Sequence, residues 1–96
     1  MGINELIQGK REQILRIAGH HGVKTVQIFG SFARGDARPD SDLDLLIEAG
    51  PERTPFFPGG FVADLEALLE RKIDVVTKQA LNSHMKNTIL REAVPL

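Results

Sequence analysis

The sequence contains no cysteine, no tyrosine and no tryptophan. Without cysteine, neither a disulfide bond nor a thiolate metal site can form. The chain has 96 residues, so we expect a single domain over residues 1–96 whose small core leaves a thin margin of stability. The absence of tyrosine has a further consequence: the protein cannot modify itself on a tyrosine hydroxyl.

An excess of one charge and long apolar runs are also missing. Lys plus Arg number 12 and Asp plus Glu number 13, for a net charge of -1, so no basic surface for nucleic acid is expected. No apolar run approaches the ~20 residues needed to cross a bilayer, and the first residues lack the pattern of a signal peptide. We therefore expect a cytoplasmic protein that does not bind a membrane and does not bind nucleic acid directly.

The hydrophobic periodicity predicts an α/β domain. The predicted order is helix, strand, strand, helix, strand, helix, at about residues 4–20, 23–29, 43–47, 60–70, 73–76 and 81–95. Residues 30–41 and 50–60 are rich in turn-forming residues and predict loops, the first with room for one helical turn. The apolar faces of the helices are expected to form the core, although a domain of this size can also bury part of one against a partner.

Two carboxylates stand at the start of an otherwise apolar strand. Asp is disfavoured in strands, yet Asp42 and Asp44 alternate with Leu43 and Leu45. Because side chains alternate along a strand, both carboxylates face one side of the sheet and both leucines face the other. Two carboxylates this close repel each other, and a bound divalent cation removes that penalty. Oxygen ligands of this kind favour Mg²⁺ or Mn²⁺.

The lengths of the connections predict how the strands pair. If Gly30 and Ser31, at the end of the first strand, are to lie near Asp42, the first two strands must be antiparallel, and their connection is short for a parallel crossover. The helix near residues 60–70 has the right length for a crossover, which makes the second and third strands parallel. Asp74 then lies beside the other two carboxylates, so three acidic side chains surround one cavity.

The corner formed by Gly30 and Ser31 has the features of a phosphate site. Gly30 has no Cβ to keep a phosphate away from the backbone, and Ser31 offers a hydroxyl and a backbone N–H. The guanidinium groups of Arg34 and Arg38 can each donate two parallel hydrogen bonds to phosphate oxygens. Gly35 reduces the backbone strain of the turn. Two metal ions about 4 Å apart would stabilise the attacking and leaving oxygens, while the third carboxylate binds one metal and accepts the proton of the attacking hydroxyl.

Simpler roles exist for these residues. Asp42 and Asp44 also fit an exposed strand edge or a turn cap, Asp74 fits an ordinary strand entry, and Arg34 and Arg38 fit a solvated loop. Structural roles are expected for the remaining polar and aromatic candidates, Asp36, Asp40, His20, His21, His84, Phe56, Phe57 and Phe61.

The segment from Gly30 to Leu45 resembles a known signature. Gly-Ser, ten further residues and Asp-x-Asp resemble the DNA polymerase beta-like nucleotidyltransferase superfamily, and the small size is most similar to its minimal nucleotidyltransferases, called MNT. Residues 73–76, Ile-Asp-Val-Val, resemble the strand of the family's third carboxylate. The resemblance covers nearly the whole chain, although only about 16 residues are specific. It implies the minimal nucleotidyltransferase fold, a mixed β-sheet of three or more strands flanked by helices.

The resemblance also implies an activity, a partner and a set of site residues. MNT proteins are antitoxins of HEPN-domain ribonuclease toxins encoded beside them, and they transfer AMP from ATP, with Mg²⁺, to a tyrosine of the toxin. The lack of tyrosine here fits an acceptor on a partner protein. The implied catalytic and metal-binding residues are Asp42, Asp44 and Asp74. The implied nucleotide-binding residues are Gly30, Ser31, Arg34, Gly35, Arg38 and Ser41.

Two other functions stay open. A non-catalytic antitoxin would keep the nucleotide site for stability and would neutralise its HEPN partner by covering it. A nucleotidyltransferase that acts on RNA ends, or on a small molecule such as an aminoglycoside, is less favoured because the sequence has no basic stripe and no substrate domain is expected after residue 96.

Overall fold

A four-stranded mixed sheet in the order β3-β2-β1-β4 is the framework of the protein. The computed structural model describes residues 7–38, 40–51, 57–81 and 83–96. Its strands are β1 Val23–Phe29, β2 Leu43–Ala49, β3 Ile73–Thr77 and β4 Val94–Pro95. Its helices are α2 Arg11–His20, α3 Ser31–Arg34, α4 Gly59–Leu69 and α5 Ser83–Glu92, with a 3-10 turn, η1, at Lys78–Ala80. The predicted α/β fold with a mixed sheet is confirmed.

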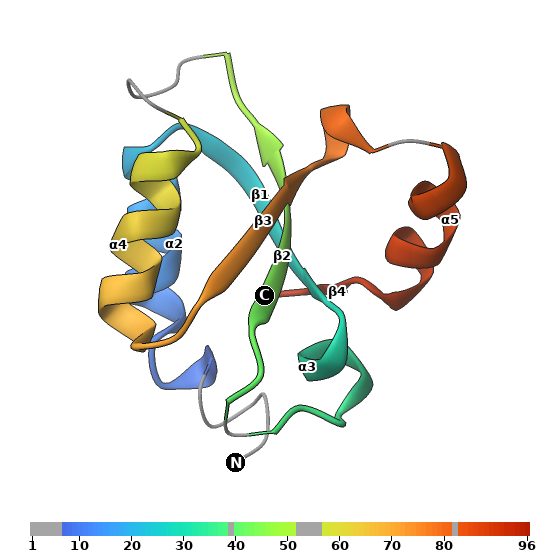
Figure 1. Cartoon of the computed structure of the whole chain (residues 1–96). Helices are drawn as coiled ribbons and strands as arrows, with labels where there is room; N and C mark the ends of the chain where they lie inside the picture. Colours follow the sequence, from blue (N-terminus) through green and yellow to red (C-terminus); the bar gives the residue numbers. More distant parts are fainter. Residues whose placement is uncertain (1–6, 39, 52–56, 82) are drawn as a thin grey trace.

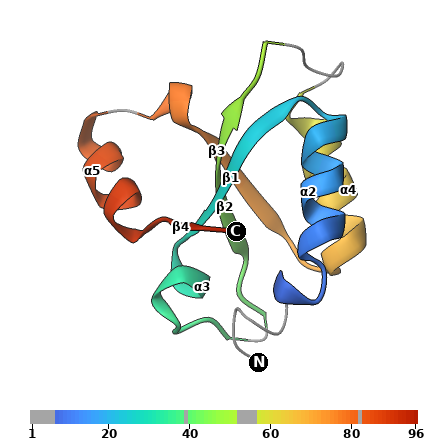
Figure 2. The ribbon, with the colours of Figure 1, turned by 180° about the vertical axis from the view of Figure 1, so that it is seen from behind.

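The helices lie on both sides of the sheet. Helices α2 and α4 lie side by side against one face, whereas α5 lies on the other side and α3 lies at the end of β1 (Figure 1). The view from behind shows the same arrangement (Figure 2). Within the described residues, no helix is long and apolar enough to cross a membrane.

The main core lies between the sheet and the pair α2 and α4. Leu43, Leu45 and Ile47 of β2 are at most 1% exposed and belong to the same cluster as Phe61 and Leu65 of α4. Each such side chain contributes about 1.5–3 kcal/mol when it is fully buried. The alternation that was predicted for β2 therefore places its odd-numbered leucines in the core and leaves its carboxylates for the opposite face.

The register of the sheet follows the predicted arrangement. Strands β1 and β2 are antiparallel, with Phe29 opposite Asp44. Strands β2 and β3 are parallel, with Asp44 opposite Asp74. Helix α4 lies between β2 and β3 in the sequence and provides the crossover that a parallel pair requires.

The first predicted helix is not continuous. Residues 7 and 8 are helical, but Gly9 and Lys10 form a turn and α2 begins at Arg11. Glycine in a helix interior costs about 0.5–1 kcal/mol relative to alanine, which favours a break at this position. The predicted start near residue 4 lies outside the described residues. The prediction of one helix over 4–20 is therefore wrong in its continuity.

The last helix ends earlier than predicted. It ends at Glu92 rather than near Pro95, and Val94–Pro95 pair with β1 as strand β4. The proline ring restricts the residue before it to extended backbone, so Val94 cannot continue the helix. Ile89 of α5 is 5% exposed, but Met85, predicted on the same core face, is 49% exposed.

The structural role that was predicted for His21 fits its surroundings. Its ring is buried, and its Nε2 lies 2.7 Å from Oδ2 of Asp64. The contact joins the end of α2 to α4. It lies away from Asp44, because Val23, two residues after His21, pairs with Ala49 at the opposite end of β2. Phe61 is a core residue, as expected, whereas Phe56 lies outside the described residues.

Candidate active site

Three predicted acidic residues lie around the start of β2 and β3. Asp44 and Asp74 are paired in register on neighbouring parallel strands, so their side chains leave the sheet on the same face. Asp42 lies two residues before Asp44 and contributes to its electrostatic environment. Burial raises the pKa of Asp44, and the negative charges of Asp74 and Asp42 raise this pKa further. The structure thus places Asp44 and Asp74 on one face of the sheet, with Asp42 near enough for its charge to act on Asp44.

Gly30 lies directly against the Asp44 carboxyl group. Gly30 has φ 76° and ψ -153°, a conformation that side chains disfavour. A Cβ on Gly30 would overlap the carboxylate and would lie 3.1 Å from Cγ of Asp44. The sequence predicted that a missing Cβ at Gly30 allows a close approach. In the structure, the group that approaches is the Asp44 side chain.

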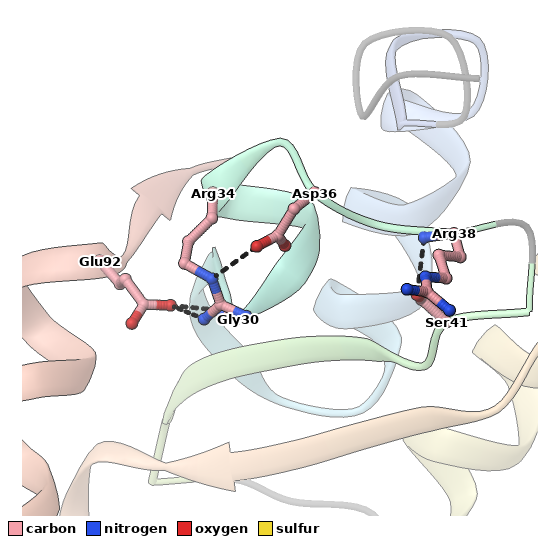
Figure 3. Close-up of polar contacts among 6 residues, drawn as sticks. All are labelled: Gly30, Arg34, Asp36, Arg38, Ser41 and Glu92. Carbon is pink, nitrogen blue, oxygen red and sulfur yellow. Dashed lines mark hydrogen bonds and ion pairs between the residues drawn. The ribbon is translucent and has the colours of Figure 1, made fainter.

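The sequence analysis missed Glu92, which joins the predicted phosphate corner. One oxygen of Glu92, Oε1, accepts hydrogen bonds from the Gly30 backbone N–H at 3.0 Å and from Nη1 of Arg34 at 2.8 Å. Nε of Arg34 donates to Asp36 at 3.3 Å. Figure 3 shows Arg34 between the two carboxylates. Asp36 and then Glu92 raise the pKa of Arg34, which therefore stays positively charged.

The predicted nucleotide contacts Arg38 and Ser41 form a separate turn. The Arg38 backbone N–H donates to Oγ of Ser41 at 2.7 Å, and the Ser41 N–H donates to the Arg38 carbonyl at 2.9 Å. Figure 3 shows this pair apart from the group of Gly30, Arg34 and Glu92. The Ser41 hydroxyl therefore shapes the loop before β2, and the Arg38 side chain is exposed.

Ser31 and Gly35 mark the two ends of α3. The Ser31 carbonyl accepts the N–H groups of Gly35 and Asp36, each at 3.0 Å. Gly35 has φ 85° and ends the helix in the left-handed conformation, which glycine adopts at little cost. The predicted turn at Gly35 is thus a helix C-cap.

Arg71 is a second residue that the sequence analysis missed. Its Nη1 donates to the Ser41 carbonyl at 3.1 Å, and its guanidinium lies 5.0 Å from the centre of the Phe32 ring. Arg71 thereby connects the turn before β3, the helix α3 and the loop that leads to Asp42. Next to it, Nζ of Lys72 lies 3.9 Å from a carboxylate oxygen of Asp42.

The carboxylate groups at this face are of the chemical type that binds a divalent cation. Carboxylate oxygens are the ligands that Mg²⁺ prefers, and a cation would offset the negative charge that raises the pKa of Asp44. Within the described part of the chain, no three acidic, histidine or cysteine side chains are already close enough to hold a metal ion. Asp42 is directed instead toward Lys72, so side-chain rotation is needed to complete a ligand set.

The candidate site does not coincide with the cavity near the chain's end. A cavity of about 290 Å³ is lined by Ile7, Gln8, Arg11, Ile28, Val94, Pro95 and Leu96. None of the predicted site residues lines it. The carboxylate face is open instead: Asp74 is exposed and Asp42 and Asp44 are partly buried.

Residues 10–96 match the nucleotidyltransferase domain family. This chain belongs to that family. Among its relatives, a candidate protein adenylyltransferase of Methanocaldococcus jannaschii is 36% identical over 94 residues, which cover 98% of this chain and 97% of the relative. The protein adenylyltransferase MntA of Thermococcus cleftensis is 41% identical over 75 residues, which cover 76% of this chain and 74% of MntA.

Solved structures agree with this membership. A candidate minimal nucleotidyltransferase superposes with a TM-score of 0.85 at 40% identity, covering 100% of this nucleotidyltransferase and 97% of that chain. A lower-identity neighbour comes from a complex of a tri-AMPylated HEPN toxin of Shewanella oneidensis with an MNT antitoxin. Its TM-score is 0.68 at 13% identity, with 92% of this chain and 69% of that chain covered, and it shows the shared fold. The protein is a minimal nucleotidyltransferase, homologous to protein adenylyltransferases.

Proposed function

We propose that this nucleotidyltransferase transfers AMP from ATP to a tyrosine of a HEPN-domain ribonuclease toxin and acts as its antitoxin. The observation that carries the proposal is the in-register pairing of Asp44 with Asp74 beside the Gly30 corner. Its homology to protein adenylyltransferases and its shared fold with an MNT antitoxin support the acceptor class. The reaction is expected in the cytoplasm, within one domain of residues 1–96.

In this proposal Asp42, Asp44 and Asp74 hold two Mg²⁺ ions. The metal supplies charge neutralisation for the triphosphate and the leaving group. The predicted nucleotide contacts come from α3 and the loop that follows it, at Gly30, Ser31, Arg34, Gly35, Arg38 and Ser41. Arg34 is close enough to Asp44 for its positive charge to act on that carboxylate, and its guanidinium is suited to bind phosphate oxygens.

The proposed transfer exchanges one phosphorus–oxygen bond for another. The tyrosine oxygen attacks the α-phosphorus of ATP, the bond from this phosphorus to the β-phosphate oxygen breaks, and pyrophosphate leaves. Asp74 would accept the phenolic proton, and its exposure supports this role because an exposed carboxyl group can release the proton to water. Arg34 would bind the negative charge of the departing pyrophosphate.

The acceptor must lie on another molecule, because this chain has no tyrosine. A net charge of -1 gives no general attraction for RNA. A protein acceptor therefore agrees better with the composition than an RNA end does.

The test uses the full chain with α-labelled ATP, Mg²⁺ and a HEPN-domain protein as the acceptor. We expect label on a tyrosine of the HEPN protein and loss of this label when Mg²⁺ is chelated. Asp44→Asn should reduce the rate by more than the roughly 10- to 100-fold that is typical for outer-shell partners of a metal. Asp40→Asn is the matched control, since Asp40 is an exposed aspartate in the loop that leads into β2.

Two results would overturn the proposal. If the folded protein binds Mg²⁺ and ATP but never labels the HEPN protein, and the Asp42→Asn, Asp44→Asn double variant still neutralises the ribonuclease, the protein is a binding antitoxin. If label appears only on RNA ends or on an aminoglycoside, the acceptor class is wrong.

A further inference from the structure

We propose that Glu92 is a positioning residue for nucleotide binding: its carboxylate holds the Arg34 guanidinium and the Gly30 corner in the orientation that receives the triphosphate. This inference rests on the proposed function and assigns a role in it to the C-terminal helix α5. Glu92 acts through Gly30 and Arg34 and need not touch the nucleotide.

The contact unites two separate parts of the chain. The same oxygen of Glu92 accepts from the Gly30 backbone N–H and from Nη1 of Arg34, 62 and 58 positions earlier in the sequence. The Glu92 side chain is 26% exposed and the Arg34 side chain is 50% exposed. Because the Gly30 N–H and the Arg34 side chain are bonded to the same oxygen, Glu92 fixes the position of one relative to the other.

The contact with Glu92 sets the orientation of the Arg34 guanidinium group. A guanidinium is a planar group with five donors in a rigid fork. Asp36 accepts from Nε and Glu92 accepts from Nη1 of Arg34, so two bonds define the plane of the fork. Among the described residues, no hydrogen bond involves Nη2 of Arg34, which leaves donors for a phosphate. Exposed ion pairs of this kind add little stability, so we assign Glu92 a role in orientation.

Strand β4 anchors Glu92 at this place. Glu92 is the last residue of α5, and Val94, two residues later, pairs with Ile28 of β1. Strand β1 itself leads into Gly30. The position of Glu92 relative to the corner is therefore fixed by the sheet, since both segments are attached to the same end of β1.

The opposite role makes a different prediction. If Glu92 merely occupied the place of a phosphate, its removal would tighten ATP binding, because a negative group would be taken away from the site. If Glu92 positions Arg34, its removal weakens ATP binding, and a neutral acceptor of the same shape restores it. The sign of the change in affinity separates the two roles.

The experiment measures the Kd of Mg²⁺-ATP by calorimetry on the full chain without acceptor protein. We expect Glu92→Ala to raise the Kd about tenfold, equivalent to about 1.4 kcal/mol. Glu92→Gln keeps an oxygen acceptor and should stay within about threefold of wild type. Glu12→Gln, an exposed charge on α2, is the control and should leave the Kd unchanged. Thermal unfolding of each variant identifies a temperature at which all are folded.

A double-mutant cycle shows whether Glu92 acts through Arg34. If it does, Glu92→Ala costs much less affinity in an Arg34→Ala background than in the wild type. Tighter binding by Glu92→Ala, or full additivity with Arg34→Ala, would overturn the positioning role. If wild type binds and transfers while Glu92→Ala matches it, only this inference fails. If wild type itself binds no Mg²⁺-ATP, the proposed function fails.

Discussion

Replacement of Gly30 by alanine measures how closely the backbone at Gly30 packs against the Asp44 carboxylate. The backbone of Gly30 is in a region that is nearly restricted to glycine, and a residue held there costs about 1–3 kcal/mol. The new Cβ would also overlap the Asp44 carboxyl group, and crowding of this kind typically costs another 1–3 kcal/mol. Alanine restricts the unfolded chain, which returns about 0.4–1 kcal/mol. We therefore expect Gly30→Ala to lose about 3 kcal/mol of unfolding free energy.

Two other glycines separate the cost of backbone strain from the cost of crowding against Asp44. Gly35 has a positive φ of 85° but no atom within 4 Å of its missing Cβ. Gly35→Ala should therefore lose only the roughly 1–2 kcal/mol of unfolding free energy that a left-handed backbone costs a residue with a Cβ. Gly19 has neither the strain nor the contact. It lies in α2, where alanine is the better helix former, so Gly19→Ala should gain about 0.5–1 kcal/mol.

The assay is urea unfolding followed by circular dichroism, with the slope of the transition compared among the variants. A loss of 1 kcal/mol corresponds to roughly 4–8 °C in Tm for a domain of this size, so the expected effect of Gly30→Ala is large. If Gly30→Ala and Gly35→Ala lose the same free energy, Asp44 does not press against the corner. The account of the site given above would then be wrong.

Two further predictions concern the charged residues around the site. Because the pKa of Asp44 is raised in the folded state, its ionised form opposes folding at neutral pH, and this penalty fades as pH falls through the folded pKa. In metal-free buffer Asp44→Asn should therefore raise Tm at pH 7 and flatten its dependence on acid pH, and a lower Tm would contradict this. Arg71→Ala should lose about 1–3 kcal/mol of unfolding free energy with its bond to Ser41 and its ring contact, as measured in urea. The exposed Arg16→Ala should change by less than about 0.5 kcal/mol, and an equal loss would refute the role of Arg71.

Much of the sheet was predictable because the relevant signals are local. The alternation of Asp42, Leu43 and Asp44 fixes which face of β2 is polar, and the lengths of the two connections fix the directions of β1 and β3. These two facts lead to the prediction that Asp74 lies beside Asp42 and Asp44, whereas the register of Asp44 with Asp74 comes from the structure. The roles of the site residues themselves stay predictions.

The missed features depend on contacts between distant segments. Strand β4 has only two residues, too few to show a period of two, and it exists because β1 offers an unpaired edge. Glu92 reads in the sequence as one more polar residue of a helix, and Arg71 as a surface cation after α4. Only the fold brings Glu92 to Gly30 and Arg71 to Ser41, so no local pattern could identify them.

The central position of β2 has a consequence for the dynamics of the site. Amide hydrogens exchange slowly where a strand is bonded along both edges and buried, and faster toward the margins of a sheet. Strand β2 is paired on both edges from Asp44 to Ile47, and most of its residues are buried. Strand β4, in contrast, pairs with β1 at only two positions, Gln27 with Pro95 and Ile28 with Val94. Local opening of β4 and α5 would therefore release Glu92 from the corner while Asp44 stays in place.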